Sequence, residues 1–167
     1  MPEVLGIDIG GVIIDRIAND DTDTSFFTDN YLRTTPVLGA FEAIARLISE
    51  RFGRRNVHLI SKAGEKVQAK TLHWFEHHRF FEQTGVLPEN VHFCLTREEK
   101  APLCKDLGVT HFVDDKLEVH SYLFDFVMFR YLFMPSEREV ERYRQFLPGV
   151  IHIENWNELL VVLLEAD

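Results

Sequence analysis

Five polar residues lie directly after short apolar runs, or on the segment that leads into one, and together they could do chemistry. They are Asp8, Ser61, Lys100, Asp114 and Asp115. Three carboxylates that meet at one point repel each other and need a cation, and sites rich in oxygen suit Mg²⁺. A lysine and a hydroxyl can bind the oxygens of a phosphoryl group. The remaining carboxylate can then act as a nucleophile toward phosphorus.

The elements that must position these residues alternate along the chain. Apolar runs predict strands at 4–7, 12–14, 56–60, 91–95, 110–113, 126–133 and 150–153. Apolar stripes, capping residues and stop signals predict helices at 36–51, 65–81, 96–108, 136–146 and 156–164. Strands that alternate with helices predict an α/β fold, in which a mainly parallel sheet lies between two layers of helices. The carboxyl ends of such strands meet at one edge of the sheet, where ligands gather.

Four segments resemble, in the right order, the four motifs of the haloacid dehalogenase-like (HAD) superfamily. LGIDIGGVII (5–14) resembles the first motif, a strand followed by D-x-D-x-[TV], and LIS (59–61) resembles the second. Lys100 matches the third motif, with Lys105 as the less favoured alternative, and HFVDD (111–115) resembles the fourth. Together the motifs span most of the chain. The resemblance implies a Rossmann-like three-layer sandwich and Mg²⁺-dependent phosphohydrolase activity on a phosphorylated small molecule or macromolecule.

The resemblance also implies a role for each matching residue. Asp8 would be the nucleophile that forms an aspartyl-phosphate. Ser61 and Lys100 would hold the phosphoryl oxygens, and Lys62 and Gly11 would add contacts to the substrate.

A second set of residues is implied for the metal. Asp8, Asp115 and the backbone carbonyl of Gly10 would ligate Mg²⁺. Asp114 would be a further ligand, or would orient metal-bound water and Lys100.

Gly10 departs from the family pattern, because the phosphatases of this family carry a second Asp at this position. That Asp protonates the leaving group and then activates water, and such a group is worth about 10²–10⁴ in rate. The departure leaves three alternatives: a slow phosphatase, a substitute acid elsewhere, or a domain that binds phosphate compounds or proteins without turnover. Non-phosphatase chemistry also stays open, since dehalogenases and phosphonate-cleaving members lack this Asp. Candidate substitutes are Asp15, Asp20, Asp21 and Asp23.

The segment 15–35 is polar and irregular, and we expect a loop or flap there. It is too short for a separate cap domain of about 50 residues or more. The sequence therefore predicts one capless domain over 1–167, with an open site that a neighbouring subunit could cover. Phe26, Phe27 and Tyr31 could form a small hydrophobic rim.

Composition excludes several classes of protein. The chain has 167 residues, 46% of them hydrophobic, and a formal charge of −9, which argues against nonspecific binding to nucleic acid or anionic membranes. No run reaches the ~20 apolar residues that a membrane span needs. Cys94 and Cys104 are expected to be buried thiols. With no signal-peptide pattern at the start, the cytoplasm is the expected compartment.

Two other patterns have simpler explanations than a site. His73, His77 and His78 lack the third ligand of a zinc site and are expected on an amphipathic helix face. The aromatic residues of the same segment are expected in the core, with a homo-oligomer interface as the alternative. A receiver-type signalling domain is disfavoured, because the strand at 91–95 ends in Leu-Thr instead of the required Asp.

Overall fold

The computed structural model describes residues 1–16 and 30–165. In this part of the chain six strands form one sheet in the order β3-β2-β1-β4-β5-β6, and every neighbouring pair is parallel. The strands are β1 (Leu5–Ile7), β2 (Val57–Lys62), β3 (Val91–Cys94), β4 (His111–Asp114), β5 (Phe129–Phe133) and β6 (Val150–Ile153). The predicted parallel α/β sheet is confirmed. Its order reverses at β1, which lies between β2 and β4.

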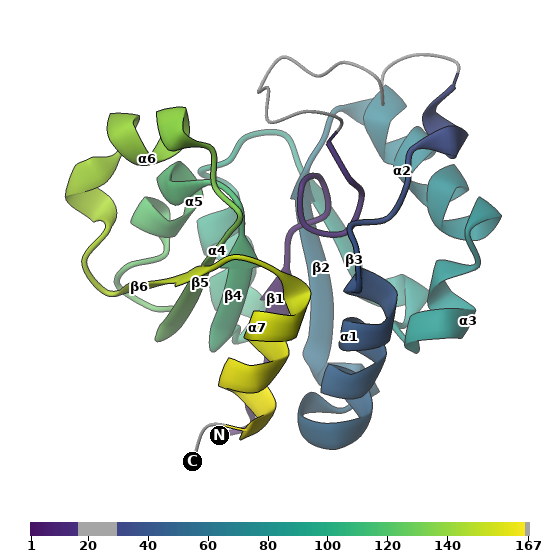
Figure 1. Cartoon of the computed structure of the whole chain (residues 1–167), viewed down its shortest axis with the longest axis horizontal. Helices are drawn as coiled ribbons and strands as arrows, with labels where there is room; N and C mark the ends of the chain where they lie inside the picture. The colour runs from purple at the N-terminus through teal and green to yellow at the C-terminus, as the bar shows by residue number, and fades with distance from the viewer. Residues whose placement is uncertain (17–29, 166–167) are drawn as a thin grey trace.

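Helices cover both faces of this sheet (Figure 1). They are α1 (Ala40–Leu47), α2 (Glu65–His77), α3 (Phe80–Thr84), α4 (Lys100–Leu107), α5 (Leu117–Tyr122), α6 (Glu137–Arg142) and α7 (Trp156–Leu160). The larger core joins β1 to α1, α2, α3 and α7, while the smaller core joins β4 to α4 and α5. Among the described residues there is no large cap domain, as predicted, and no helix is long and apolar enough to span a membrane.

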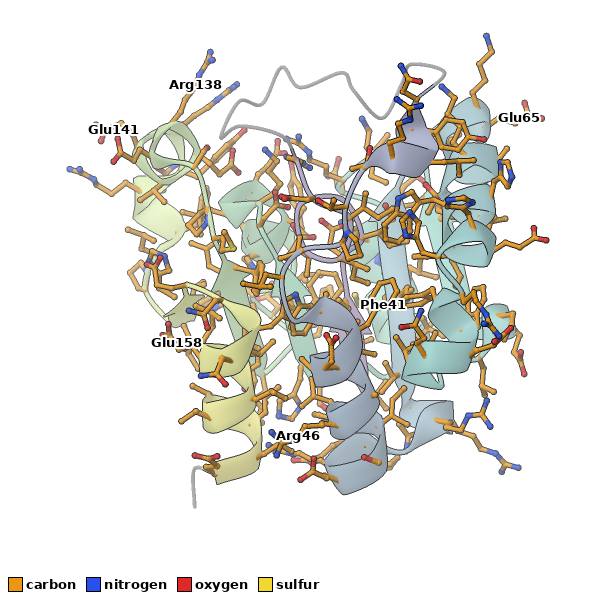
Figure 2. The ribbon with its side chains drawn as sticks, turned by 45° about the vertical axis from the view of Figure 1, so that its right-hand side comes forward. Phe41, Arg46, Glu65, Arg138, Glu141 and Glu158 are labelled. Carbon is orange, nitrogen blue, oxygen red and sulfur yellow. The ribbon has the colours of Figure 1, made fainter. Side chains whose placement is uncertain are left out.

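Side chains follow this layered arrangement. Phe41 on α1 points into the interior, where its ring packs edge-on against Trp74 and Phe80 (Figure 2). Charged residues of α2 and α6 lie at the outer edges of the same view, among them Glu65 and Arg138. The last helix docks on its own chain, because Leu159 and Leu163 of α7 and the turn after it are buried in the larger core.

The predicted strand at 12–14 is wrong. The backbone N–H groups of Ile13 and Ile14 both donate to the carbonyl of Ile9, at 2.8 and 3.1 Å, so the chain turns sharply there. Within the described residues, Ile14 forms only isolated bridges, one of them to Pro36. Three apolar residues are too few to reveal a period, and these three are buried in a turn.

Several helix boundaries also differ from the prediction. The first helix begins at Ala40, because Gly39 adopts a left-handed conformation. The predicted helix at 65–81 breaks at Arg79, which has a φ of 55° and lets the Phe80 ring stack on Phe75. The strand predicted at 126–133 begins only at Phe129. The helix α5, which precedes this strand, was not predicted.

Two tryptophans fix the segment that follows β1. The indole N–H of Trp156 donates to the carbonyl of Val12 at 2.8 Å, and that of Trp74 donates to Thr34 at 2.9 Å. Both rings are fully buried. Because α7 binds the turn at Val12 and α2 binds Thr34, the described residues at both ends of this segment have a defined position.

Candidate functional site

Three carboxylates meet at the carboxyl edge of the central strands. Asp8 follows β1, while Asp114 ends the neighbouring strand β4 and Asp115 follows it. The backbone N–H of Asp8 donates to Val113 at 2.9 Å, which continues the pairing of the two strands. One oxygen from each carboxylate lies within 4.8 Å of the others, and all three residues are buried. Parallel pairing therefore brings residues more than a hundred positions apart into one acidic cluster.

Lys100 lies inside this cluster. Its Nζ donates to Oδ1 of Asp8 at 3.0 Å and to Oδ2 of Asp114 at 2.7 Å. The lysine is the first residue of α4, and its side chain is only 3% exposed. Lys105, the alternative from the sequence, lies on the exposed side of the same helix. The structure thus brings Lys100, and not Lys105, to the carboxylates.

The two adjacent aspartates have different partners. Both side-chain oxygens of Asp114 accept hydrogen bonds, Oδ2 from Lys100 and Oδ1 from the backbone N–H of Lys116 at 2.9 Å. Asp115 has Oδ2 3.2 Å from Nη1 of Arg16, while its buried Oδ1 has no hydrogen-bond partner among the described residues. A buried carboxylate oxygen without a partner is costly unless a ligand meets it.

The two glycines after β1 allow the chain to pass close to this cluster. Gly11 has a φ of +79°, and a Cβ on it would lie 2.6 Å from Oδ2 of Asp115. The carbonyl of Gly10 accepts a hydrogen bond from Nη2 of Arg16 at 3.4 Å. Sequence reasoning missed Arg16. The available signal was that it is the only lysine or arginine before Arg33, in a segment rich in aspartate.

Ser61 and Lys62 lie on the strand beside β1. The register pairs Ile7 with Leu59, so Ser61 lies at the carboxyl end of β2, at the same edge of the sheet as Asp8. Ser61 is buried, whereas Lys62 is exposed.

The remaining predicted residues are not part of the cluster. Asp15 is exposed. Tyr31 is hydrogen bonded through its hydroxyl to Nδ1 of His73 at 2.5 Å, so that histidine faces the described C-terminal part of the predicted flap. The others, Asp20, Asp21, Asp23, Phe26 and Phe27, lie outside the described residues.

The electrostatics of the cluster show a shortage of positive charge. Burial and the neighbouring charge of Asp114 raise the pKa of Asp8 above its ordinary value, against the opposing effect of Lys100. Burial also raises the pKa of Asp115 well above its usual range, although Arg16 lowers it. Burial alone would lower the pKa of Lys100, but the charges of Asp114 and Asp8 outweigh it and raise that pKa. The two cations that contact the carboxylates, Lys100 and Arg16, together with the weaker effect of Lys116 on Asp115, therefore do not fully compensate three buried carboxylates.

These residues fit a divalent cation. Oxygens on opposite sides of one Mg²⁺ are about 4.2 Å apart, given metal–oxygen bonds of ~2.1 Å, and the three carboxylate oxygens lie within 4.8 Å of one another. The unpartnered oxygen of Asp115 supplies one vacant acceptor. Hard oxygen donors favour Mg²⁺ over softer metals.

Known structures resemble the whole chain. A D,D-heptose 1,7-bisphosphate phosphatase from B. bronchiseptica, solved with magnesium and phosphate, has a TM-score of 0.68 at 16% identity, over 99% of both chains. The enzyme of the same name from Burkholderia thailandensis has a TM-score of 0.60 at 12% identity, over 98% of this chain and 99% of that one. A protein named as a haloacid dehalogenase-like hydrolase, from Burkholderia xenovorans LB400, has a TM-score of 0.65 at 12% identity over the full length of both chains.

No protein-family model matches the sequence, and a search of curated proteins finds no significant match. At these low identities the structural likeness shows the fold, and the fold agrees with the one that the four sequence motifs predict. The chain therefore has the fold of the haloacid dehalogenase-like hydrolases.

Proposed function

We propose that the chain is a Mg²⁺-dependent phosphohydrolase that cleaves phosphomonoesters through an aspartyl-phosphate on Asp8. The observation that carries this proposal is the buried meeting of Asp8, Asp114 and Asp115 with Lys100 at the carboxyl edge of β1 and β4. Nucleophile, cation and metal ligands are then all within reach of one phosphoryl group. The named activity of two similar structures, a sugar bisphosphate phosphatase, supports a phosphorylated small molecule as substrate.

The hydrogen bonds support a different role for each carboxylate. Asp115 would bind Mg²⁺ directly through its unpartnered Oδ1, together with Asp8 and the carbonyl of Gly10. Asp114 already uses both oxygens, so its main role would be to hold Lys100. When bound, Mg²⁺ neutralises charge on the carboxylates and on the phosphoryl oxygens.

Asp8 would attack phosphorus with one oxygen while the bond from phosphorus to the leaving oxygen breaks. Lys100, which donates to Asp8 at 3.0 Å, favours the ionised carboxylate and would also bind a phosphoryl oxygen. Ser61, Lys62 and the backbone at Gly11 would provide further contacts to the phosphate. Water then hydrolyses the aspartyl-phosphate, which returns the Asp8 carboxylate and releases inorganic phosphate.

Gly10 is the observation that favours a second candidate function, binding of phosphate compounds without turnover. It leaves the leaving group without the usual proton donor, so turnover should be slower by about 10²–10⁴, or roughly 3–5 kcal/mol of barrier. Asp15 is exposed and is not one of the clustered carboxylates. If turnover is absent altogether, the same site would act as a module that binds phosphate compounds.

The remaining expectations are proposals as well. We propose one capless domain over residues 1–167 in a cytoplasmic setting, with a macromolecular phosphate as the alternative substrate. The described part of the chain leaves the site without a large cap, which suits a substrate larger than a free metabolite or a lid from a second subunit.

The test is release of inorganic phosphate from a panel of sugar phosphates, other phosphorylated metabolites and phosphopeptides, with Mg²⁺ or with EDTA. Asp8→Asn should abolish the Mg²⁺-dependent release, whereas Asp106→Asn, an exposed aspartate on α4, should leave it unchanged. Equal turnover by Asp8→Asn and the parent protein would remove Asp8 from the reaction. No turnover on the whole panel, together with Mg²⁺ binding, would favour the binding module.

A further inference from the structure

The guanidinium group of Arg16 bridges two groups that we assign to the metal. Its Nη1 lies 3.2 Å from Oδ2 of Asp115, and its Nη2 donates to the carbonyl of Gly10 at 3.4 Å. The first contact is a charged pair, and the second uses the one backbone oxygen that the metal site needs. A cation that belongs to the chain therefore lies where the ion would bind.

Gly10 and Gly11 leave room for this guanidinium group. Among the described residues, a Cβ built on Gly10 would have Nη2 of Arg16 as its one neighbour within 4 Å, at 3.6 Å. A Cβ on Gly11 would lie 3.1 Å from Nε of the same side chain. The space next to residue 10, which a longer side chain there would enter, thus contains the arginine. The absence of a side chain at Gly10, where the family phosphatases carry Asp, therefore leaves the space that the Arg16 guanidinium occupies.

Arg16 and Mg²⁺ compete for these groups, because two cations this close to each other repel. Mg²⁺ needs near-octahedral geometry at ~2.1 Å and binds carbonyl and carboxylate lone pairs directly. The carbonyl of Gly10 already accepts a hydrogen bond from the guanidinium, and one oxygen of Asp115 is ion-paired with it. Even an ion on the free Oδ1 of Asp115 would be repelled by a positive charge this close.

We infer that Arg16 is a tethered competitor of the metal ion: it compensates the carboxylates while the ion is absent and must be displaced when the ion binds. The inference rests on the metal site of the proposed function. Displacement does not require the core to open, because the Arg16 side chain is 37% exposed, whereas that of Lys100 is 3% exposed. Lys100 therefore stays, and Arg16 is the cation that exchanges. The protein would fill its site only above a higher Mg²⁺ concentration than the carboxylates alone would require.

The test is equilibrium binding of Mn²⁺, followed by the EPR signal of the free ion and displaced with Mg²⁺, on the full chain without substrate. Arg16→Ala and Arg16→Gln should bind both ions about tenfold to 100-fold more tightly, as expected when one charge-assisted contact no longer has to be broken. The matched control is Arg46→Ala, since Arg46 pairs with Glu50 at 2.6 Å and its side chain is 49% exposed. The control should change the affinity by no more than about twofold, because this surface charge acts on the cluster only through screened solvent.

Thermal unfolding gives a second readout of the same exchange. In EDTA, Arg16→Ala should have a lower Tm than the parent protein, because the carboxylates lose a counter-charge. At saturating Mg²⁺ it should gain more in Tm than the parent protein does.

Three results would overturn the inference: unchanged affinity in both Arg16 variants, weaker binding in them, or no ion binding by any of the proteins. None of these measurements involves turnover. A failed phosphatase assay with tighter metal binding in the Arg16 variants would leave the inference standing and remove only the proposed reaction.

Discussion

Replacement of Lys100 by methionine tests whether the carboxylate cluster depends on an internal counter-charge. The Nζ atom makes two short charge-assisted hydrogen bonds, at 3.0 Å to Asp8 and 2.7 Å to Asp114, in a site closed to solvent. Methionine keeps the length and apolar stem of the lysine but leaves buried carboxylates without compensation. Breaking a buried ion pair from one side costs about 3–5 kcal/mol. This is a large share of the ~5–15 kcal/mol that stabilises a typical domain.

The loss should depend on pH with a definite sign. Burial and Asp114 already raise the pKa of Asp8 above its unfolded value, and Lys100 opposes this shift. Without the lysine, the pKa of Asp8 in the folded state rises further. A carboxyl group with a raised pKa costs stability as the pH rises above the unfolded pKa of ~4, so the penalty is greatest at neutral pH and shrinks in acid.

The assay is urea unfolding at 25 °C in EDTA, at pH 7 and at pH 5, for Lys100→Met and the parent protein. The difference in free energy of unfolding should be about 3–5 kcal/mol at pH 7 and clearly smaller at pH 5. Lys105→Met is the matched control on the exposed side of α4, with an expected change within about 0.5 kcal/mol. A difference below about 1 kcal/mol at pH 7, the cost of an ordinary surface pair, or one that grows in acid, would refute the reasoning.

Three further predictions follow from single positions. Gly11→Ala should lose more stability and more Mn²⁺ affinity than Gly53→Ala: both glycines have a φ near +80°, but only the Cβ at Gly11 would meet a carboxylate, at 2.6 Å. Gly10→Asp should raise the rate of phosphate release at least about tenfold in an Arg16→Ala background. The gain should be smaller in the parent protein, where the new carboxylate would pair with Arg16. No gain in either background would show that the missing acid does not limit the rate. Burial lowers the pKa of His111 to about 4, so below pH ~6.5 the unfolded chain binds a proton that the folded chain binds only near pH 4, and the free energy of unfolding falls as the pH falls through that range. His111→Phe should therefore remove at most about 2 kcal/mol of the stability loss between pH 7 and 5 in urea titrations. An unchanged pH profile would contradict the assignment.

The acidic cluster was predictable because its geometry follows from strand ends. Apolar runs that stop at Asp8 and Asp114 predict strands, and alternation with helices predicts that these strands are parallel. Parallel neighbours bring their carboxyl ends to one edge, so residues distant in the sequence meet without any knowledge of side-chain packing. Lys100 could be chosen over Lys105 only through the motif resemblance, because both lie on the same predicted helix.

Features that depend on packing were not predictable in the same way. The turn at Ile13 is accompanied by the hydrogen bond from Trp156 to Val12, a contact between residues 144 positions apart. The break at Arg79 depends on the stacking of Phe80 on Phe75. Neither contact leaves a local pattern in the sequence. Arg16 was missed for a similar reason, since its partners are a backbone carbonyl and a residue 99 positions away.

The two cations of the site differ in a way that divides it into a fixed half and an exchangeable half. Lys100 is buried beneath the carboxylates and is ion-paired with two of them, so removing it from the cluster would leave uncompensated negative charge in the core. Arg16 approaches from the solvent side and binds the remaining carboxylate and a backbone oxygen. In the proposed exchange a divalent ion would replace only the second cation. Lys100 would hold Asp8 in place and oppose the rise of its pKa whether or not metal is bound, while Arg16 would set the ion concentration at which the site can accept a phosphoryl group.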